Sequence, residues 1–415
     1  MSNHFSGNVT QQNLENENLP LSGITVVDLS RALAGPYCTA LLADMGARII
    51  KIESGSGDPS REWPPYDGNR SLYYDSTNRN KESVWIDLYS DEGKGVLDVL
   101  LSQADVLLEN YKLGTLARMG YTEQKLTALN PELIHIAITA YGNTGPLSQE
   151  PGLDQVMQGI SGLASVTGPV DEDGYRVGIP IIDITSGMIA AFATVAMLIG
   201  RMRGYSARNA STSLYETALA LSTFQGQTAI TLGVAPEKQG NNHPSITPYG
   251  VYPTASDRII IAASTESHWQ KFCELLGRRE WMADQRFQSG QNRTENRNVL
   301  NAMISEELKQ KSADYWLNKI RHQGIPVGPL LDYQQVMQSE QTLALDLIQQ
   351  LTNSAGETIQ LLRGPISMNG TPIGISKSPP SLSEDAYSIL RDHNYSEEDI
   401  QRLCANGTVK EPKND

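Results

Sequence analysis

The residue whose surroundings most suggest chemistry is Asp183. It follows the largely apolar stretch Ile179–Ile182, just before the expected start of a helix. That helix opens with Thr185, Ser186 and Gly187. A carboxylate at such a place has an ordinary role, in which it caps free amides of the first helical turn. It also has a catalytic role, because small neighbours let another molecule approach, exposed amides stabilise an oxyanion, and a carboxylate acts as a covalent nucleophile. The residues alone leave both roles open.

Two loops after expected strands carry further candidate residues. The turn Gly142–Pro146 (GNTGP) follows a strand at the edge where open α/β sheets place ligands. The stretch Glu109–Gly120 also follows a strand, and it carries an amide, a ring and two cations: Asn110, Tyr111, Lys112 and Arg118. This stretch is either an ordinary loop with a solvated basic face or the rim of an adenine-nucleotide site, in which the ring holds the base and Arg the phosphate.

Motifs for several other chemistries are missing from the sequence. There is no G-x-G-x-x-G after the first expected strand, no Walker sequence, no G-x-S-x-G and no H-E-x-x-H. No two of the six histidines stand at ligand spacing, so we expect no metal site. His135 lies within an apolar strand, which favours a core role. Hydride transfer with a nicotinamide is not supported.

Composition and charge exclude further classes. With 33 basic and 47 acidic residues the formal net charge is −14, and a nucleic-acid backbone binder needs a surplus of Lys and Arg. Three widely spaced cysteines give neither a disulfide framework nor zinc spacing and predict a cytoplasmic location. The N-terminus shows no secretory signal. The longest apolar run, Gly187–Gly200, is shorter than the about 20 residues of a membrane span, so we expect a core helix and no membrane.

Alternating strand and helix patterns must position the candidate residues. We expect strands over 24–30, 48–53, 83–88, 104–110, 133–141 and 211–216, and helices over 37–45, 91–103, 122–129, 154–165 and about 185–203. Such alternation predicts an α/β fold with a Rossmann-like, doubly wound and mostly parallel sheet. Short β segments near 249–264 and helices over 267–276 and 313–322 predict a smaller α+β domain.

The expected domain organisation follows from these patterns. Residues 1–20 are polar and predict a disordered tail. Residues 21–215 form the N-terminal part of a large domain, 216–239 a linker, and 240–331 the small α+β domain. Residues 332–415 return to the large domain. The chain therefore leaves the large domain and comes back to it.

Five ordered blocks resemble the class III coenzyme A transferases, the formyl-CoA transferase and carnitine-CoA transferase (CaiB/BaiF-like) group. The blocks cover nearly the whole chain from Leu21 and are Leu21–Glu53, Ser71–Leu88, Ala104–Tyr121, Ala140–Gly168 and Ile179–Ala191. The last one resembles the segment that bears the family's catalytic aspartate, and this places Asp183 in that role.

The resemblance implies a fold and a reaction. The fold is a homodimer of two interlocked, ring-like subunits, each with a Rossmann-like large domain and a smaller domain. The reaction moves CoA from an acyl-CoA donor to a carboxylic acid acceptor. The aspartate forms a mixed anhydride and then an aspartyl-CoA thioester. This chemistry needs hydrogen-bond donors positioned for the oxyanion and exclusion of water, but no metal and no ATP. Coenzyme A is a cosubstrate, and no tightly bound cofactor is expected.

The resemblance also implies site residues. The expected CoA contacts are Arg31, Ala32, Leu33, Ala34, Ile86, Tyr89, Asn110, Tyr111, Lys112 and Arg118. The expected active-site loop and oxyanion donors are Tyr141, Gly142, Ser186 and Gly187. Ser54, Glu82 and Tyr89 replace cations found in formyl-CoA transferases, which leaves Arg31, Lys112 and Arg118 as the best remaining cations. No glycine run lies near 226–245, and this counts against oxalate as acceptor.

Two alternatives of other classes remain. An α-methylacyl-CoA racemase would carry His before Asp154, as a proton shuttle, where this chain has Leu153. A non-catalytic CoA-binding homologue would not need an intact Asp183. The sequence does not name the acyl groups, and among acceptors we favour a dicarboxylate such as succinate.

Overall fold

The computed structural model describes residues 19–412, so nearly all of the tail expected over 1–20 lies outside the described residues. The chain divides into two compact units. The larger unit holds the chain up to Ser161, Gly178–Thr223 and the chain from Thr342 onward. The smaller unit holds Gly162–Val177 and Phe224–Gln341. The chain thus leaves the larger unit and returns to it twice.

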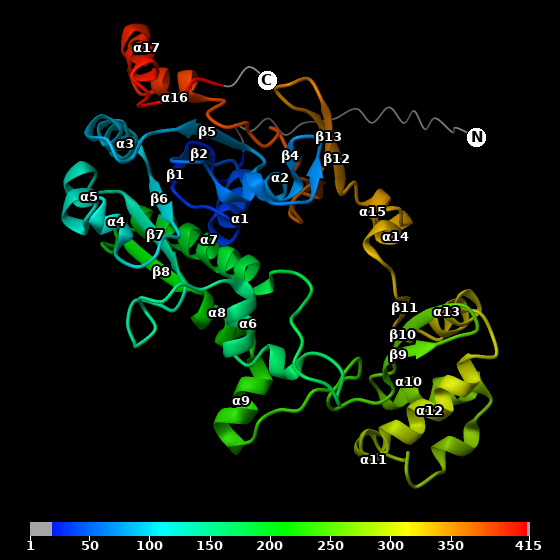
Figure 1. Ribbon diagram of the computed structural model, residues 1–415. Helices are drawn as coiled ribbons and strands as arrows, with labels where there is room; N and C mark the ends of the chain where they lie inside the picture. The colour runs from blue at the N-terminus through cyan, green and yellow to red at the C-terminus, as the bar shows by residue number, and fades with distance from the viewer. Residues whose placement is uncertain (1–18, 413–415) are drawn as a thin grey trace. The chain divides into compact units, whose positions relative to one another are not determined.

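A six-stranded parallel sheet forms the centre of the larger unit (Figure 1). In spatial order its strands are β5 (Lys81–Trp85), β2 (Arg48–Glu53), β1 (Thr25–Asp28), β6 (Val106–Glu109), β7 (Ile134–Thr139) and β8 (Asn209–Ser213). In the register of the sheet, Val26 of β1 lies opposite Ile49 of β2 on one side and Val106 of β6 on the other. The sheet confirms the predicted α/β fold with a large parallel sheet, as the apolar, β-branched strand sequences require.

Helices cover both faces of this sheet because alternate strand residues point to opposite sides. Val27, Ile50 and Leu107 share one core with α3 (Asp91–Gln103), α16 (Ala386–Asp392) and α17 (Glu397–Ala405). Helices α1 (Ala34–Asp44) and α7 (Ile181–Met202) pack against each other, α1 on β1 and β2 and α7 on β7 and β8. The remaining helices of the larger unit are α2 (Leu72–Asn78), α4 (Thr115–Arg118), α5 (Glu123–Leu129), α6 (Asp154–Ile160) and α8 (Leu214–Leu221), and α15 (Glu340–Ala344) spans the boundary.

The C-terminal segment completes the larger unit at the β5 edge. The main-chain nitrogen of Trp85 donates to Ser383 Oγ over 3.1 Å, and that of Ser83 donates to Asp385 Oδ2 over 2.8 Å. Ile86 and Val409 form an isolated antiparallel bridge. Three small antiparallel pairs are β3 (Tyr66–Asp67) with β4 (Arg70–Ser71), β12 (Ile348–Thr352) with β13 (Thr358–Leu362), and β14 (Ser367–Met368) with β15 (Thr371–Pro372).

The smaller unit has a three-stranded antiparallel sheet and its own aromatic core. The strand order is β11 (Val327–Pro329), β10 (Arg258–Ala262), β9 (Tyr249–Pro253). Its helices are α9 (Thr223–Leu232, which begins at the boundary), α10 (Glu266–Leu276), α11 (Gly290–Glu295), α12 (Arg297–Leu308), α13 (Ala313–His322) and α14 (Tyr333–Met337). Trp269, Phe272 and Ile320 are buried in one cluster, which allows this unit to fold around its own core.

Several boundaries differ from those expected. The stretch 216–239 expected as a linker holds most of α8 and all of α9, and residues 162–177 belong with the smaller unit. The stretch 211–216 expected as a strand holds the end of β8 and the start of α8. The apolar helix α7 has 22 residues, long and apolar enough to cross a membrane, so the length argument against a span is wrong. Such a helix is weak evidence for a span. One face of α7 packs on α1 and β7, but only 39% of its most apolar stretch is buried, so it is not the fully buried core helix that the sequence predicted.

Candidate functional site

Asp183 lies within the first turn of α7. The helix begins at Ile181, so the expectation that Asp183 precedes the helix is wrong, and the capping role left open for Asp183 is not observed. The main-chain nitrogens of Ile182 and Asp183 instead donate to Oδ1 of Asp154, over 2.8 and 3.3 Å. The cap that a local side chain usually supplies comes here from another helix. The carboxylate of Asp183 therefore does not serve as the cap of α7.

Asp154 is a functional candidate that the sequence did not single out. It is the first residue of α6, its side chain is buried, and its Oδ2 accepts a hydrogen bond from Gln158 Nε2 over 2.6 Å. Both carboxylate oxygens are thus satisfied inside the protein. A buried carboxylate must be paired in this way, because an unpaired one is costly. Its sequence signals were its place at the start of an expected helix and its position within the block Ala140–Gly168.

The environment of Asp183 favours its protonated form. Burial, and then the negative charge of Asp154, raise the pKa of Asp183 from 3.8 to about 7. Tyr73, on α2, is exposed to the same two negative charges. Burial, and then the charges of Asp183 and Asp154, raise the pKa of its hydroxyl. Within residues 19–412, Asp183 forms no ion pair with a cation. A raised pKa in a partly buried carboxylate is a common property of active-site groups.

Ser186 and Gly187 do not open this site to another molecule, which corrects their expected role. Both are buried, and Gly187 packs against the start of α1. A Cβ atom added to Gly187 would lie 2.5 Å from the carbonyl oxygen of Ala34 and 3.2 Å from the nitrogen of Cys38. Gly187 therefore permits close packing of two helices.

The loop after β7 holds the other expected oxyanion donors. The nitrogen of Gly142 already donates to Thr139 Oγ1 over 3.0 Å, and Gly142 has a φ of +91°. The half-buried ring of Tyr141 lies 6.2 Å from that of Tyr215. Tyr141 also faces Gly152, where an added Cβ would lie 3.4 Å from its ring. The loop therefore contacts the segment that leads into Asp154.

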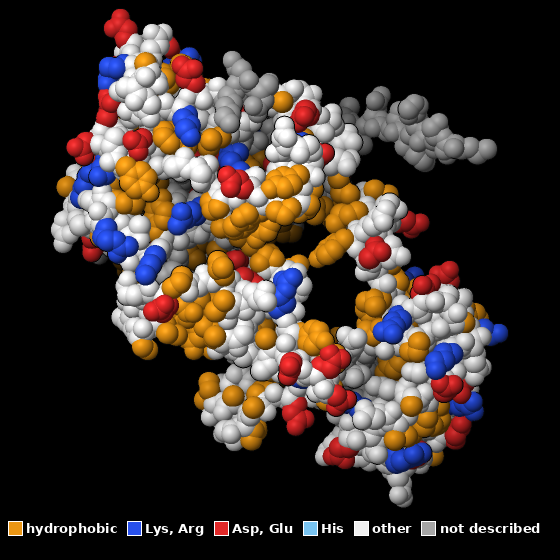
Figure 2. Space-filling view, viewed as in Figure 1, with side chains coloured by type: hydrophobic (Ala, Val, Ile, Leu, Met, Phe, Trp, Pro, Cys, Tyr) orange, Lys and Arg blue, Asp and Glu red, His pale blue; other side chains and the backbone are white. Residues whose placement is uncertain are grey.

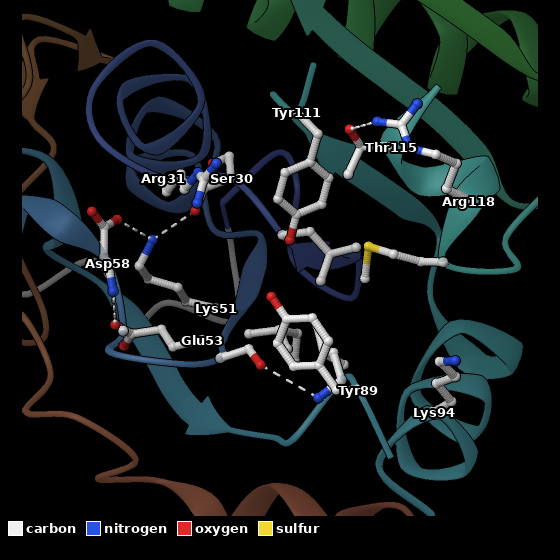
Figure 3. A pocket seen from close by; sticks show the side chains of 16 residues that line it. Ser30, Arg31, Lys51, Glu53, Asp58, Tyr89, Lys94, Tyr111, Thr115 and Arg118 are labelled. Carbon is white, nitrogen blue, oxygen red and sulfur yellow. Dashed lines mark hydrogen bonds and ion pairs between the residues drawn. The ribbon is translucent and has the colours of Figure 1, made fainter. Parts of the chain in front are cut away.

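A cavity of about 440 Å³ in the larger unit collects many of the residues expected to contact CoA (Figure 3). We call it the Arg31 cavity. It is lined by Leu29, Ser30, Arg31, Lys51, Ile52, Glu53, Ser54, Gly57, Asp58, Leu88, Tyr89, Lys94, Tyr111, Thr115, Arg118 and Met119. Arg31, Tyr89, Tyr111 and Arg118 were expected there. Lys51, Asp58 and Lys94 were not, and Asp183 does not line this cavity.

Other expected contacts lie elsewhere. The side chain of Ile86 has no exposed surface and belongs to the core, so it does not line the cavity. Lys112 is exposed and lies outside the lining. Leu33 and Ala34 are buried at the start of α1. Their backbone continues the turn that begins at Arg31.

The turn at Arg31 is fixed through its main chain. Asn110 accepts from the nitrogen of Arg31 over 3.0 Å and donates to its carbonyl oxygen over 2.9 Å. Asp58 Oδ1 accepts from the nitrogen of Ala32, whose φ of +68° is rare for a residue with a side chain. The guanidinium of Arg31 lies 5.7 Å from the centre of the Tyr111 ring. Asn110 therefore acts here as a support for the turn.

Buried charges lie beneath this turn. Lys51 contacts Asp58 Oδ2 at 2.8 Å and donates to the carbonyl oxygen of Ser30 over 2.9 Å. Burial alone would raise the pKa of Asp58, but Lys51 and Ser60 outweigh it and hold that pKa at about 2. Deeper in the sheet, burial lowers the pKa of Lys81 to about 7, although Asp28 opposes the shift. These pairs satisfy charges that would otherwise be costly to bury.

Comparison with known proteins extends these observations. Residues 21–386 match CoA-transferase family III. The succinate–glutarate CoA-transferase of Agrobacterium fabrum is 34% identical over 91% of this chain and 97% of its own. The succinyl-CoA:glutarate CoA-transferase of Homo sapiens is 30% identical over 94% and 90%. The acetyl-CoA:oxalate CoA-transferase of Acetobacter aceti is 32% identical over 90% and 95%.

Solved structures show the same fold. A CaiB/BaiF family protein from Brucella suis superposes with a TM-score of 0.81 at 32% identity, over 91% of this chain and all of the other. A Mycobacterium tuberculosis protein gives a TM-score of 0.79 at 28% identity, over 89% of this chain and 99% of the other. The agreement covers sequence and fold over nearly the whole length. The chain is a member of CoA-transferase family III, whose enzymes use coenzyme A as a cosubstrate.

Proposed function

We propose that this enzyme transfers CoA between two carboxylic acids through a covalent intermediate on Asp183. The observation that carries the proposal is the position of Asp183 in the first turn of α7, where Asp154 takes the main-chain cap and leaves the Asp183 carboxylate unused. The family match favours transfer over the racemase and the non-catalytic alternatives. Leu153 also lacks the proton-shuttling group that a racemase would need.

The proposed reaction consists of four balanced exchanges at acyl carbon. A carboxylate oxygen of Asp183 attacks the thioester carbonyl of the donor, and the CoA thiolate leaves. The thiolate then attacks the Asp183 carbonyl of the mixed anhydride and releases the donor acid. The acceptor carboxylate attacks the aspartyl thioester, and the thiolate leaves again. Its attack on the acceptor carbonyl of the new anhydride forms the product thioester and restores Asp183.

The proposed CoA site is the Arg31 cavity. Tyr89 and Tyr111 supply aromatic surface for the adenine, and Arg31 and Arg118 supply positive charge for phosphates. Tyr89 is 87% exposed, so its ring is free to contact a ligand. The turn that carries Arg31 is already held by Asn110 and Asp58, which lowers the cost of ordering it on binding.

We propose dicarboxylates as the substrates of both half-reactions. Support comes from the names of relatives, which act on succinate and glutarate, on succinyl-CoA and citramalate, and on succinyl-CoA and mesaconate. Oxalate is the acceptor named for one relative, but this chain lacks the glycine run expected of oxalate-using members.

A CoA-exchange screen tests the proposal. Succinyl-CoA, glutaryl-CoA and acetyl-CoA are each incubated with isotopically labelled succinate, glutarate, mesaconate, oxalate and a monocarboxylate control. New thioesters are then identified by mass spectrometry. Labelled dicarboxyl-CoA products that require Asp183 support the proposal. Exchange restricted to monocarboxylates would contradict the substrate assignment.

We further propose that the protein works as an interlocked homodimer. Helix α7 carries an exposed apolar row, Met188, Phe192, Ile199 and Met202. Val156 and Ile160 of α6, and Leu153 just before that helix, are also exposed. Figure 2 shows hydrophobic side chains gathered over the part of the larger unit that holds α6, α7 and α8. An apolar surface of this kind on a soluble enzyme is typical of a subunit interface.

A further inference from the structure

The Arg31 cavity has two cationic ends. Figure 3 shows Arg118 and Lys94 on one side of the rings of Tyr89 and Tyr111, and Arg31 with Lys51 on the other side. Coenzyme A carries its phosphates in two places, a diphosphate that leads to the pantetheine arm and a monoester on the ribose 3′-oxygen. The two cationic ends and the two phosphate groups can be matched in only two ways.

The position of α7 selects between these two matches. Gly187, one helical turn after Asp183, packs directly on Ala34, and Ala34 lies three residues after Arg31 in the same turn. The Arg31 end of the cavity is therefore the end that leads toward Asp183. Since the pantetheine arm must carry the thioester to Asp183, the diphosphate belongs at the Arg31 end. The ribose 3′-phosphate then belongs at the end with Arg118 and Lys94.

Lys94 is suited to this contact. It lies in the first turn of α3, where its nitrogen donates to Ser90 O over 3.1 Å and its carbonyl oxygen accepts from Tyr121 Oη over 3.1 Å, so its backbone is fixed. Within the described residues its ammonium forms no ion pair, and Arg118 contacts only the neutral Thr115 hydroxyl, over 2.7 Å. By contrast, Asp58 already neutralises Lys51 at the other end. Among the described residues, the Arg31 end therefore offers one cation without an ion pair, Arg31 itself, whereas the other end offers two, Lys94 and Arg118.

We propose that Lys94 binds the ribose 3′-phosphate of coenzyme A together with Arg118. The inference rests on the proposed function and adds a phosphate ligand that was not evident in the sequence. Two cations on separate elements, α3 and α4, hold one dianionic group between them, and charge-assisted contacts of this kind are stronger than neutral ones.

Calorimetric titration with CoA and with 3′-dephospho-CoA tests the assignment. We expect Lys94→Met to weaken CoA binding about tenfold and to leave the affinity for 3′-dephospho-CoA unchanged. Lys94→Arg should retain most of the CoA affinity. Lys125→Met serves as a charge-matched control, because Lys125 lies on α5 outside the cavity and pairs with Asp98. Circular dichroism of each variant checks that the fold is intact.

The other outcomes are distinct. Equal weakening for CoA and 3′-dephospho-CoA would overturn the assignment and move Lys94 to the diphosphate. No change for either ligand would show that Lys94 is not a ligand, and the proposed transfer reaction would stand. A wild-type protein that binds neither molecule would overturn the proposed function, and this inference with it.

Discussion

Oδ1 of Asp154 lies 3.3 Å from the main-chain nitrogen of Asp183, so one carboxylate holds the backbone that carries the other. The same contact places a negative charge beside the proposed nucleophile. Asp154 therefore fixes the position of Asp183 and disfavours its ionisation, and these two effects can be separated by mutation.

Replacement of the proposed nucleophile should abolish transfer. Asp183→Asn is expected to lower kcat by several orders of magnitude, since the covalent route needs a carboxylate at that position. In the wild type, incubation with acyl-CoA followed by hydroxylamine should mark the peptide that contains Asp183 in mass spectra. Transfer by Asp183→Asn at a near-normal rate would contradict the mechanism.

The same variant should change how stability depends on pH. A carboxyl whose pKa rises from 3.8 to about 7 on folding keeps its proton where the unfolded chain has lost it. Its contribution to the free energy of unfolding is therefore greatest below about pH 4 and decreases as the pH rises toward 7. Relative to wild type, Asp183→Asn should gain thermal stability between pH 5 and pH 8. A Tm difference that is constant with pH would argue against the raised pKa.

The pH profile of transfer should report the charge of Asp154. Wild-type kcat/KM should rise with pH through about 7, as Asp183 ionises. Asp154→Asn keeps an oxygen for the α7 amides but removes the charge, so the midpoint should move to lower pH. Asp154→Ala also removes the cap and should lower both kcat and the free energy of unfolding, by about 1 kcal/mol for the lost cap. An unchanged midpoint in Asp154→Asn would contradict the electrostatic role.

Arg118 and Lys112 should differ in their effect on CoA. Arg118 lines the Arg31 cavity, whereas Lys112 is exposed outside it. Arg118→Ala should raise KM for the CoA substrate with little change in kcat, because the contact is the same in the ground and transition states. Lys112→Ala should change KM less, and both effects should shrink at high salt. Steady-state kinetics at two ionic strengths checks this, and a larger effect of Lys112→Ala would contradict it.

The contact between α7 and α1 should not tolerate a side chain at Gly187. Gly187→Ala places a methyl group about 2.5 Å from the Ala34 carbonyl oxygen and should cost about 1–3 kcal/mol of stability. Gly95→Ala is the matched control, because Gly95 also lies within a helix, α3, but apart from its own stretch of helix no atom lies within 4 Å of the position that its added Cβ would take. It should stabilise the protein by about 0.5–1 kcal/mol. Thermal unfolding of both variants decides, and equal stabilities would contradict the packing argument.

The parallel strands could be predicted from the sequence because their signals are local. The strand Arg48–Glu53 and the helix Asp91–Gln103 have the expected bounds, since apolar runs and a Ser90 cap define them. The start of α7 was misplaced because its cap comes from Asp154, 28 residues earlier than Ile182. No local pattern reveals such a cap.

The site was predictable only in part for the same reason. Arg31 and Tyr111 follow the ends of strands that a parallel sheet brings to one edge, and Arg118 lies in α4, the helix that follows one of them. Ile86 also follows a strand, but its side chain points into the core, and that direction depends on the pairing register. Lys94 reaches the cavity from α3. The sequence predicts that helix but not where it packs relative to the cavity.

The turn at Arg31 has an evolutionary consequence. Asn110 and Asp58 hold it through main-chain atoms, at the nitrogen and carbonyl oxygen of Arg31 and the nitrogen of Ala32. None of these contacts depends on which side chain stands at position 31. Selection can therefore exchange that side chain without altering the path of the backbone beneath it. Variation at position 31 can therefore change the affinity for coenzyme A in single steps while the scaffold stays intact.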